Sequence, residues 1–234
     1  MKELKSRSFS FIDKSDFFWG KYEILDELGR GGMGKVYKAY DAELKRTVAI
    51  KTLLAQERAN TRQKERFRQE AQILARLSHP NIIRVFEAGE HKGTLFFVME
   101  YLEGETLERK MKEKILPVED SLRIMETIAK AVAYLHGRNI LHRDLKPANV
   151  MITRENEIKI MDFGLSKIGD SGQKLSQEGE ILGTVPYMPS EQLEGGTEEV
   201  DERSDVYSLG IILYQMLTRV LPFTGETVDR KSVV

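Results

Sequence analysis

Cysteine is absent from the 234-residue sequence. Its absence excludes a disulfide framework, a thiolate metal site and a cysteine nucleophile, and it fits the reducing conditions of the cytosol. Histidine is scarce as well: the four histidines are not paired at ligand spacing, which argues against a zinc site. We therefore expect a cytoplasmic protein without zinc.

Long hydrophobic runs and a strong net charge are also lacking. The longest apolar run, Leu209 to Tyr214, is too short to span a bilayer, and no apolar run follows Lys2, Lys5 and Arg7 to make a signal peptide. The net charge of −1 argues against a general nucleic-acid or membrane-surface binder. With 41% hydrophobic and 31% charged residues, the chain is expected to be globular.

The first half of the chain is expected to form an antiparallel sheet with one helix. Residues 1–18 show no clear period and are interpreted as a leader or linker. The strands are expected at Tyr22–Leu28, Lys35–Tyr40, Thr47–Leu53, Ile82–Phe86 and Thr94–Leu102. Between them, Phe67, Ala71, Leu74 and Leu77 share one face of a helix that spans Arg62–Leu77.

The second half is expected to be mainly helical, which makes the fold class α+β. Apolar residues recur with helical spacing between Pro117 and His136, at Leu122, Met125, Ile128, Ala129, Val132 and Leu135. A strand is expected at Glu157–Met161. The segment Asp205–Thr218 is apolar nearly all round, as in a helix that is buried on most sides.

The most unusual stretch is Ile140–Ile152, because it collects His142, Arg143, Asp144, Lys146 and Asn149 between apolar flanks. The flanks are predicted to be short buried strands. Pro147 forbids a helix across the polar part and favours an extended Lys146. We interpret the stretch as a rigid catalytic loop in preference to a solvated turn.

A glycine-rich turn, Gly29 to Gly34, precedes Val36 in the pattern G-x-G-x-x-G-x-V. Glycines allow backbone amides to approach phosphate oxygens closely. A dinucleotide-binding dehydrogenase would place a helix after the glycines, whereas this sequence places a strand there. The turn is therefore interpreted either as a flap over phosphates or as an ordinary hairpin turn.

Two further positions carry unusual charges. Lys51 ends an apolar strand, and Glu70 lies on the apolar face of the predicted helix, so the two are expected to pair. Asp162 follows a strand and precedes Phe163 and Gly164, a position that suits a magnesium ligand as well as an ordinary turn.

Together these motifs resemble the eukaryotic-type protein serine/threonine kinases, and in particular their bacterial branch. The similarity extends from about Tyr22 to Phe223 and includes the glycine loop, Val48-Ala-Ile-Lys51, His142-Arg-Asp-Leu-Lys-Pro-Ala-Asn149 and Asp162-Phe-Gly164. It implies a bilobal fold over residues 19–234. The lobe of residues 19–102 would hold a five-stranded antiparallel sheet with one helix, and residues 103–234 part of a mainly helical lobe.

The resemblance also implies roles for individual residues in a signalling enzyme that transfers the γ-phosphoryl group of ATP to Ser or Thr of a protein substrate. Asp144 would be the base, and Lys146 would stabilise the transferring phosphoryl group. Lys51, braced by Glu70, would hold the α- and β-phosphates, with Asn149 and Asp162 as ligands of Mg²⁺. Residues implied in nucleotide binding are Leu28, Gly29, Gly31, Gly34, Val36, Ala49, Lys51, Met99, Glu100, Leu102 and Met151. Leu74, Val85, His142 and Phe163 resemble the apolar spine that links the lobes.

The segment from Asp162 to Glu191 resembles an activation segment. Arg143 would sense a phosphate on it, and Ser171 and Ser176 are candidate autophosphorylation sites. Our hypothesis is that Glu180, with Glu178, partly replaces that phosphate. The stretch Gly183-Thr184 to Glu191 resembles a peptide platform, which favours a protein substrate over a small molecule.

Two departures from the family pattern stand out. The proline of Met188-Pro-Ser-Glu191 comes one place early, and the chain stops before the family's last helices. Neither Arg219 nor Arg230 stands in the place of the arginine that pairs with the Glu191 equivalent. The alternative function is therefore a catalytically impaired nucleotide-binding or scaffold fragment.

The early stop carries an expectation for stability as well. One side of Leu209, Ile212, Leu213 and Met216 would face water. Each buried side chain of this kind contributes roughly 1.5–3 kcal/mol, so we expect a destabilised, aggregation-prone second lobe.

Overall fold

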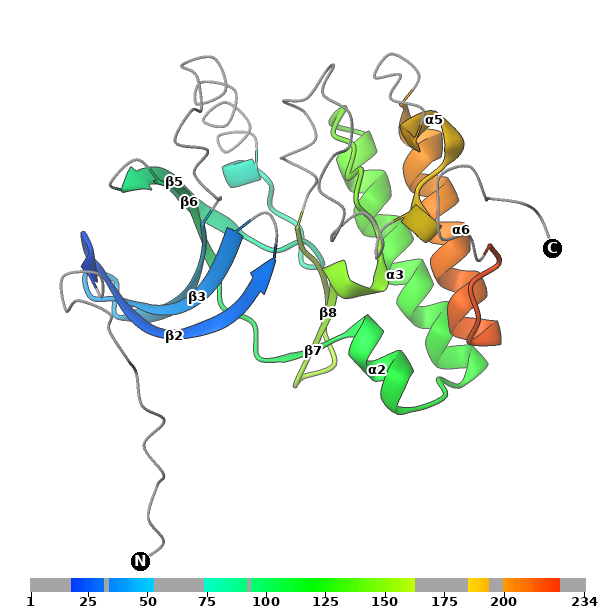
Figure 1. The fold of residues 1–234 in the computed structure, drawn as a ribbon, viewed down its shortest axis with the longest axis horizontal. Coiled ribbons are helices and arrows are strands. Elements are labelled where there is room, and N and C mark those ends of the chain that lie inside the picture. Colours follow the sequence, from blue (N-terminus) through cyan, green and yellow to red (C-terminus); the bar gives the residue numbers. More distant parts are fainter. Residues whose placement is uncertain are drawn as a thin grey trace, which may run out of the picture.

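The computed structural model describes residues 18–31, 34–52, 74–91, 94–162, 185–193 and 200–223. Figure 1 shows a curved sheet on one side, a helical part on the other and a small sheet between them. The bilobal α+β architecture is therefore confirmed. Several sequence-based predictions lie outside the described residues, namely those for Glu70, Phe163, Ser171, Ser176, Glu178, Glu180 and most of the helix at 62–77.

The larger sheet has six antiparallel strands in the order β1-β2-β3-β4-β6-β5. They are β1 (Phe18–Trp19), β2 (Tyr22–Gly31), β3 (Gly34–Asp41), β4 (Arg46–Thr52), β5 (Val85–His91) and β6 (Thr94–Glu100). The five predicted strands are all present, and the two-residue strand β1 adds an edge. The boundary predicted after residue 18 falls inside β1.

The prediction for β5 was displaced along the chain. Residues 82–84 lie before the strand. Ile83 N–H donates to the Ile160 carbonyl at 2.9 Å and Ile82 forms a β-bridge with Ile160, so the backbone at these two residues pairs with the second lobe. Gly89, which lies beyond the predicted strand Ile82–Phe86, pairs with Phe96 inside the sheet. A Cβ atom at Gly89 would lie 2.6 Å from the Phe96 ring, so this glycine allows the aromatic ring to cross the strand.

Strand β4 divides its side chains between two clusters. Val48 and Ile50 are buried in an outer cluster with Phe96 and Val98. Ala49 lies on the opposite face, in a core that continues into the helical lobe. Because strand side chains alternate, Lys51 shares the face of Ala49 and points toward the other lobe. This alternation places the predicted nucleotide residues of β4 on one face.

The second lobe is built from four helices, two short 3₁₀ turns and a three-stranded sheet of order β7-β8-β9 within the described residues. Its elements are β7 (Gly104–Thr106), α2 (Leu107–Glu113), α3 (Val118–His136), η2 (Pro147–Asn149), β8 (Val150–Thr153), β9 (Ile158–Ile160), η4 (Val185–Tyr187), α5 (Ser190–Leu193) and α6 (Glu202–Thr218). A Cβ atom at Gly104 would lie 2.2 Å from the Ile152 carbonyl oxygen, so close pairing of β7 with β8 requires a glycine there.

Helix α3 has the predicted extent but a slightly rotated buried face. Ile128, Val132 and Leu135 are buried as expected, whereas Leu122 is 51% exposed. Ile124 and Ala131 take part in the core instead. The prediction followed apolar spacing alone, and both Leu122 and Ile124 satisfy that spacing, so packing against α6 and β9 decides between them.

The prediction for α6 was wrong about which side faces water. Ile212 and Met216 are buried, and Leu209 and Leu213 are partly buried against the same core. Val206 and Leu217 are exposed instead, at 58% and 46%. A helix that is apolar nearly all round has no periodicity that could identify its outer face.

The prediction of a short strand on each side of the polar stretch is correct for one side only. Val150 to Ile152 belong to β8, but Ile140 and Leu141 form no strand. Lys146 is extended as predicted, with φ −160° and ψ 160°. Pro147 does not prevent every turn of helix, because it occupies the first position of the 3₁₀ turn η2.

Within the described ranges, no helix has the length and apolar character needed to span a membrane.

Candidate active site

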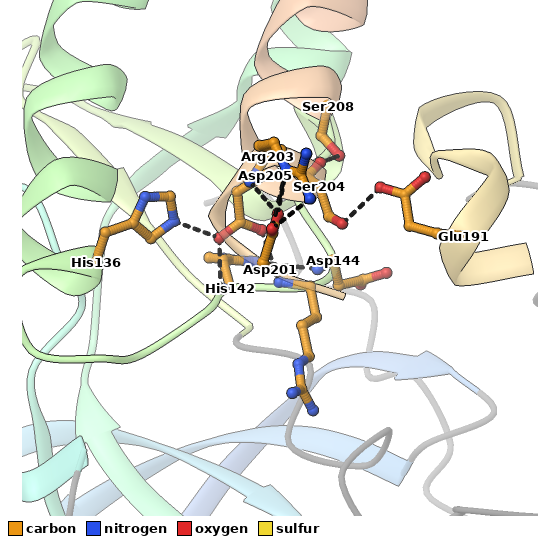
Figure 2. A network of polar contacts seen from close by, with 10 residues as sticks. His136, His142, Asp144, Glu191, Asp201, Arg203, Ser204, Asp205 and Ser208 are labelled. Atoms are coloured by element: carbon orange, nitrogen blue, oxygen red, sulfur yellow. Dashed lines mark hydrogen bonds and ion pairs between the residues drawn. The ribbon is translucent and has the colours of Figure 1, made fainter. Parts of the chain in front are cut away.

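The polar loop is held by a carboxylate that lies far along the chain. Asp205, in the first turn of α6, accepts hydrogen bonds from the backbone N–H groups of His142 at 2.8 Å and Arg143 at 2.9 Å. His136 Nε2 approaches the same carboxylate at 2.8 Å, and Asp205 is 2% exposed. Figure 2 shows these contacts converging on α6. Asp205 thus anchors the backbone at His142 and Arg143 to α6.

His142 is fully buried beneath the loop and serves as a link. Its Nδ1 accepts from the Asp144 N–H at 3.3 Å, so its Nε2 carries the proton and donates to the Met161 carbonyl at 3.0 Å. Burial lowers the pKa of His142, although the charges of Asp205 and Asp144 oppose this effect. The ring is therefore a neutral connector between the loop and the residue before Asp162.

Asp144, Lys146 and Asn149 form one compact cluster. The Asp144 Oδ2 atom accepts from Asn149 Nδ2 at 2.9 Å and lies 3.1 Å from Lys146 Nζ. Asn149 Nδ2 also donates to the Asp144 carbonyl at 2.7 Å. Asp144 is 7% exposed and Asn149 5%. The three side chains predicted for catalysis and metal binding on this loop are thus brought together with fixed orientations.

Lys51 reaches Asp162, beside this cluster, from the other lobe. Its Nζ lies 2.7 Å from Asp162 Oδ1, and the two side chains are 17% and 35% exposed. Met161 N–H donates to the Asn149 carbonyl at 2.8 Å, which holds Asp162 beside the catalytic loop. The predicted partner Glu70 lies outside the described residues, so its pairing with Lys51 stays a prediction. What the structure adds is a contact between Lys51 and Asp162 that the sequence did not indicate.

The residues present fit a magnesium ion that arrives with a phosphate group. Both hydrogen bonds of the Asn149 amide use Nδ2, which leaves its Oδ1 as the atom for a hard cation. The part of the chain that the structure describes contains no group of three or more acidic or histidine side chains able to hold a metal alone. One carboxylate and one amide oxygen suit Mg²⁺ if phosphate and water supply the remaining ligands.

The predicted adenine pocket lies on one face of the larger sheet. Val36 pairs with Lys51, and Ala49 pairs with Met99, so these side chains share a face. Ala49 and Met99 are buried in the core, and Val36 packs against it. Leu102 and Met151 are partly buried, and Leu28 is 45% exposed at the sheet edge.

The connection between the lobes carries an ion pair that sequence reasoning missed. Lys159 Nζ lies 3.3 Å from Glu100 Oε1, which also accepts from the Arg84 N–H at 2.8 Å. Glu100 N–H donates to the Arg84 carbonyl at 2.9 Å, so adenine would have to use the Glu100 carbonyl. Lys159 lies between Ile158 and Ile160, and alternation alone marks it as an ordinary solvent-facing residue.

The segment 185–193 packs against α6 and the loop. Ser208 Oγ donates to the Tyr187 carbonyl at 2.8 Å, and Tyr187 OH donates to Gln215 Oε1 at 2.7 Å. Burial raises the pKa of Tyr187 to about 12. Glu191, for which no arginine was expected within this chain, accepts a hydrogen bond from Ser204 Oγ at 2.8 Å. A serine next to Asp205 carries no signal of this role in the sequence.

Comparison with known proteins agrees with the fold and with the motifs of the loop. A family model described as the protein kinase domain matches residues 22–233. The chain is 44% identical to a probable serine/threonine-protein kinase of Streptomyces coelicolor over 215 residues. It is 41% identical to the serine/threonine-protein kinase PknB of Mycobacterium tuberculosis and 40% identical to PrkC of Bacillus subtilis.

These matches cover most of this chain and a smaller part of the relatives. The three alignments cover 88–89% of this chain but span only 32–34% of the length of the relatives. A crystal structure of the PknI kinase domain from Mycobacterium tuberculosis superposes with a TM-score of 0.73 at 29% identity, over 92% of this chain and 80% of that one.

Proposed function

Because the chain belongs to the protein kinase family, among whose bacterial serine/threonine members its relatives are found, we propose that it transfers the γ-phosphoryl group of ATP to Ser or Thr hydroxyls of protein substrates. The observation that carries this proposal is the cluster of Asp144, Lys146 and Asn149 beside Lys51 and Asp162. We place the activity in cytoplasmic signalling, with no nucleic acid as partner.

Asp144 is the base in this proposal. Its contacts with Lys146 and Asn149 both use Oδ2 and fix the plane of the carboxylate. A substrate hydroxyl that approaches the carboxylate gives up its proton to Asp144 as its oxygen attacks the γ-phosphorus, while the bond from that phosphorus to the bridging oxygen breaks and ADP leaves. Lys146, whose ammonium group lies beside the same carboxylate, neutralises charge on the transferring phosphoryl group.

Lys51 and Asp162 exchange partners when the nucleotide binds. Lys51 leaves Asp162 for the α- and β-phosphate oxygens, and Asp162 with Asn149 Oδ1 becomes available to a metal. Asp162 and Asn149 would hold Mg²⁺, which would supply neutralisation of phosphate charge when bound. Glu70 is the proposed brace of Lys51 in this state.

The base and sugar of ATP occupy the shared face of the larger sheet. Val36 and Ala49 pack on one side of adenine and Met151 on the other, with Met99 behind. The Glu100 carbonyl and the backbone of Leu102 supply hydrogen bonds. Leu28 and the glycines Gly29, Gly31 and Gly34 cover the nucleotide from above.

Regulation is proposed to act through Arg143 and through residues outside the described ranges. Arg143 pairs with a phosphate on Ser171 or Ser176, and Glu180 substitutes in part for that phosphate. If Glu180→Ala leaves the rate of the phosphatase-treated protein unchanged, this role of Glu180 is excluded.

The test is incorporation of radiolabelled phosphate from ATP and Mg²⁺ into a generic protein substrate. Asp144→Asn is expected to lower the rate by about 10²–10⁴-fold while nucleotide binding remains, because the general base is lost but no cation is removed. Asp120→Asn, which alters an exposed carboxylate on α3, is the matched control and should retain the rate. A wild-type chain that binds nucleotide but transfers no phosphate would instead support the nucleotide-binding or scaffold fragment.

A further inference from the structure

Two consecutive residues in the first turn of α6 hold two different segments. Asp205 holds the catalytic loop through the N–H groups of His142 and Arg143. Ser204 holds Glu191, since its Oγ donates to Glu191 Oε1 at 2.8 Å. Figure 2 shows both contacts leaving the same turn of the helix in different directions.

We propose that Ser204 is a positioning residue that fixes the peptide-binding segment to the catalytic loop through its hydrogen bond to Glu191. The proposal rests on the proposed function, because it concerns how the protein substrate is presented to Asp144. Ser204 touches neither substrate nor nucleotide and acts through Glu191.

The first support is the environment of the bond. Ser204 is 2% exposed, so water does not compete for its hydroxyl, and a bond from a buried hydroxyl to a carboxylate is charge-assisted. Across the described ranges, no lysine or arginine forms an ion pair with Glu191. Arg203, the nearest cation in sequence, instead pairs with Asp201 at 2.8 Å.

The second support is that the bond closes a ring. Arg143 N–H donates to Asp205 Oδ1, and the Arg143 carbonyl accepts from Gln192 Nε2 at 2.6 Å. Gln192 is adjacent to Glu191 in the chain, and Ser204 is adjacent to Asp205. Three hydrogen bonds therefore join the helix, the catalytic loop and the segment 185–193 in a closed circuit, in which neighbouring bonds reinforce each other.

Loss of the Ser204 hydroxyl opens this circuit at one point only. Asp205 keeps its hold on the catalytic loop, so the residues that meet ATP stay in place. Glu191 loses its anchor, so the segment that would receive the peptide gains freedom. The expected signature is a defect in peptide use without a defect in nucleotide use.

The experiment compares Ser204→Ala with Ser121→Ala by steady-state kinetics. Ser121 is a matched control, because it is a fully buried helical serine whose hydroxyl has no hydrogen-bond partner in the described part of the chain. We expect Ser204→Ala to raise the KM for a peptide substrate by about three- to tenfold, the range of one lost hydrogen bond. The KM for ATP and the rate of ATP hydrolysis without peptide should stay within about twofold, since neither uses the bond.

A double-mutant cycle and hydrogen exchange complete the test. Glu191→Ala should reproduce the peptide defect, and adding Ser204→Ala to it should add nothing further. Amide exchange should accelerate at Tyr187–Gln192 in Ser204→Ala and remain slow at His142–Leu145.

A peptide KM in Ser204→Ala equal to that in Ser121→Ala overturns the proposal, as does additivity with Glu191→Ala. If the wild-type chain transfers no phosphate, the proposed function fails separately. The positioning role then stands only if exchange accelerates at Tyr187–Gln192, and it falls if exchange there is unchanged.

Discussion

Asp205 and Asp162 are both aspartates beside the same loop, yet their surroundings differ. Asp205 is 2% exposed and accepts hydrogen bonds from two backbone N–H groups and one histidine ring. The Asp162 side chain is 35% exposed and meets Lys51, a flexible cation from the other lobe. A carboxylate that holds structure has its oxygens satisfied by fixed donors, whereas one that would take part in chemistry is paired with a partner that a substrate can replace.

The largest loss of stability is expected when Asp205 is replaced. Asp205→Ala leaves two buried backbone N–H groups and a histidine ring without an acceptor, so we expect a loss of about 3–5 kcal/mol in the free energy of unfolding. Urea denaturation measures it. Asp201→Ala, which removes the N-cap of the same helix, should cost only about 1 kcal/mol. Equal losses in the two variants would contradict the special role of Asp205.

Replacement of Asp162 should show the opposite pattern, with a large loss of activity and a small loss of stability. Asp162→Asn is expected to reduce phosphoryl transfer by about 10²–10³-fold, because the charge that faces the metal and phosphates disappears. The free energy of unfolding should change by less than about 1 kcal/mol, since the pair with Lys51 is partly solvated. Transfer assays and urea denaturation on the same sample test both statements. If Asp162→Asn retains phosphoryl transfer or is strongly destabilised, the contrast between Asp162 and Asp205 is contradicted.

His142 lies between Asp205 and Asp162. Its protonation makes the free energy of unfolding depend on pH. Because burial lowers its folded pKa below the unfolded value of about 6.5, the unfolded state binds the proton first as the pH falls. The contribution of the neutral His142 ring to the free energy of unfolding is therefore present above about pH 6.5 and is lost below it, at up to about 1.4 kcal/mol for each pH unit. Denaturation curves at pH 7.5 and 5.5 measure this loss.

His142→Gln should reduce the acid sensitivity. His79, whose pKa is lowered in the same direction mainly by burial, remains in that variant and keeps part of the sensitivity. If the loss between pH 7.5 and 5.5 is the same in wild type and His142→Gln, then His142 is not its source.

The smallest effect is expected on the outer face of α6. Leu217→Lys and Val206→Lys should change the free energy of unfolding by less than about 0.5 kcal/mol, because both side chains are exposed. Ile212→Ala on the inner face should cost about 2–5 kcal/mol. Thermal melting and light scattering of the three variants measure this contrast.

The sequence predicted those parts of the site in which an unusual residue type stands in a strongly patterned context. Lys51 on an apolar strand, Asp162 at a strand end and the polar residues between Ile140 and Ile152 all contrast with their neighbours. Asp205 also contrasts with the apolar helix behind it. The structure brings these residues together.

The remainder could not be predicted, because it depends on how elements meet. Ser204 and Lys159 are common residues in ordinary positions, and only tertiary packing brings them to Glu191 and Glu100. The predictions for the outer face of α6 and for the position of β5 along the chain were wrong for a related reason. Apolar spacing fits two answers equally well there. Contacts with α3 select the outer face of α6, and the contacts of Ile82 and Ile83 with Ile160 in β9 set where β5 begins.

The anchor of the catalytic loop also has a consequence for the order in which the protein acquires its parts. His142 and Asp205 are 63 residues apart, whereas β2, β3 and β4 follow one another in the chain as antiparallel neighbours. Distant contacts form later than local ones, and a chain leaves the ribosome from its N-terminus. During synthesis the loop that would carry the chemistry therefore emerges without its anchor. It becomes a site only after the first turn of α6 has followed.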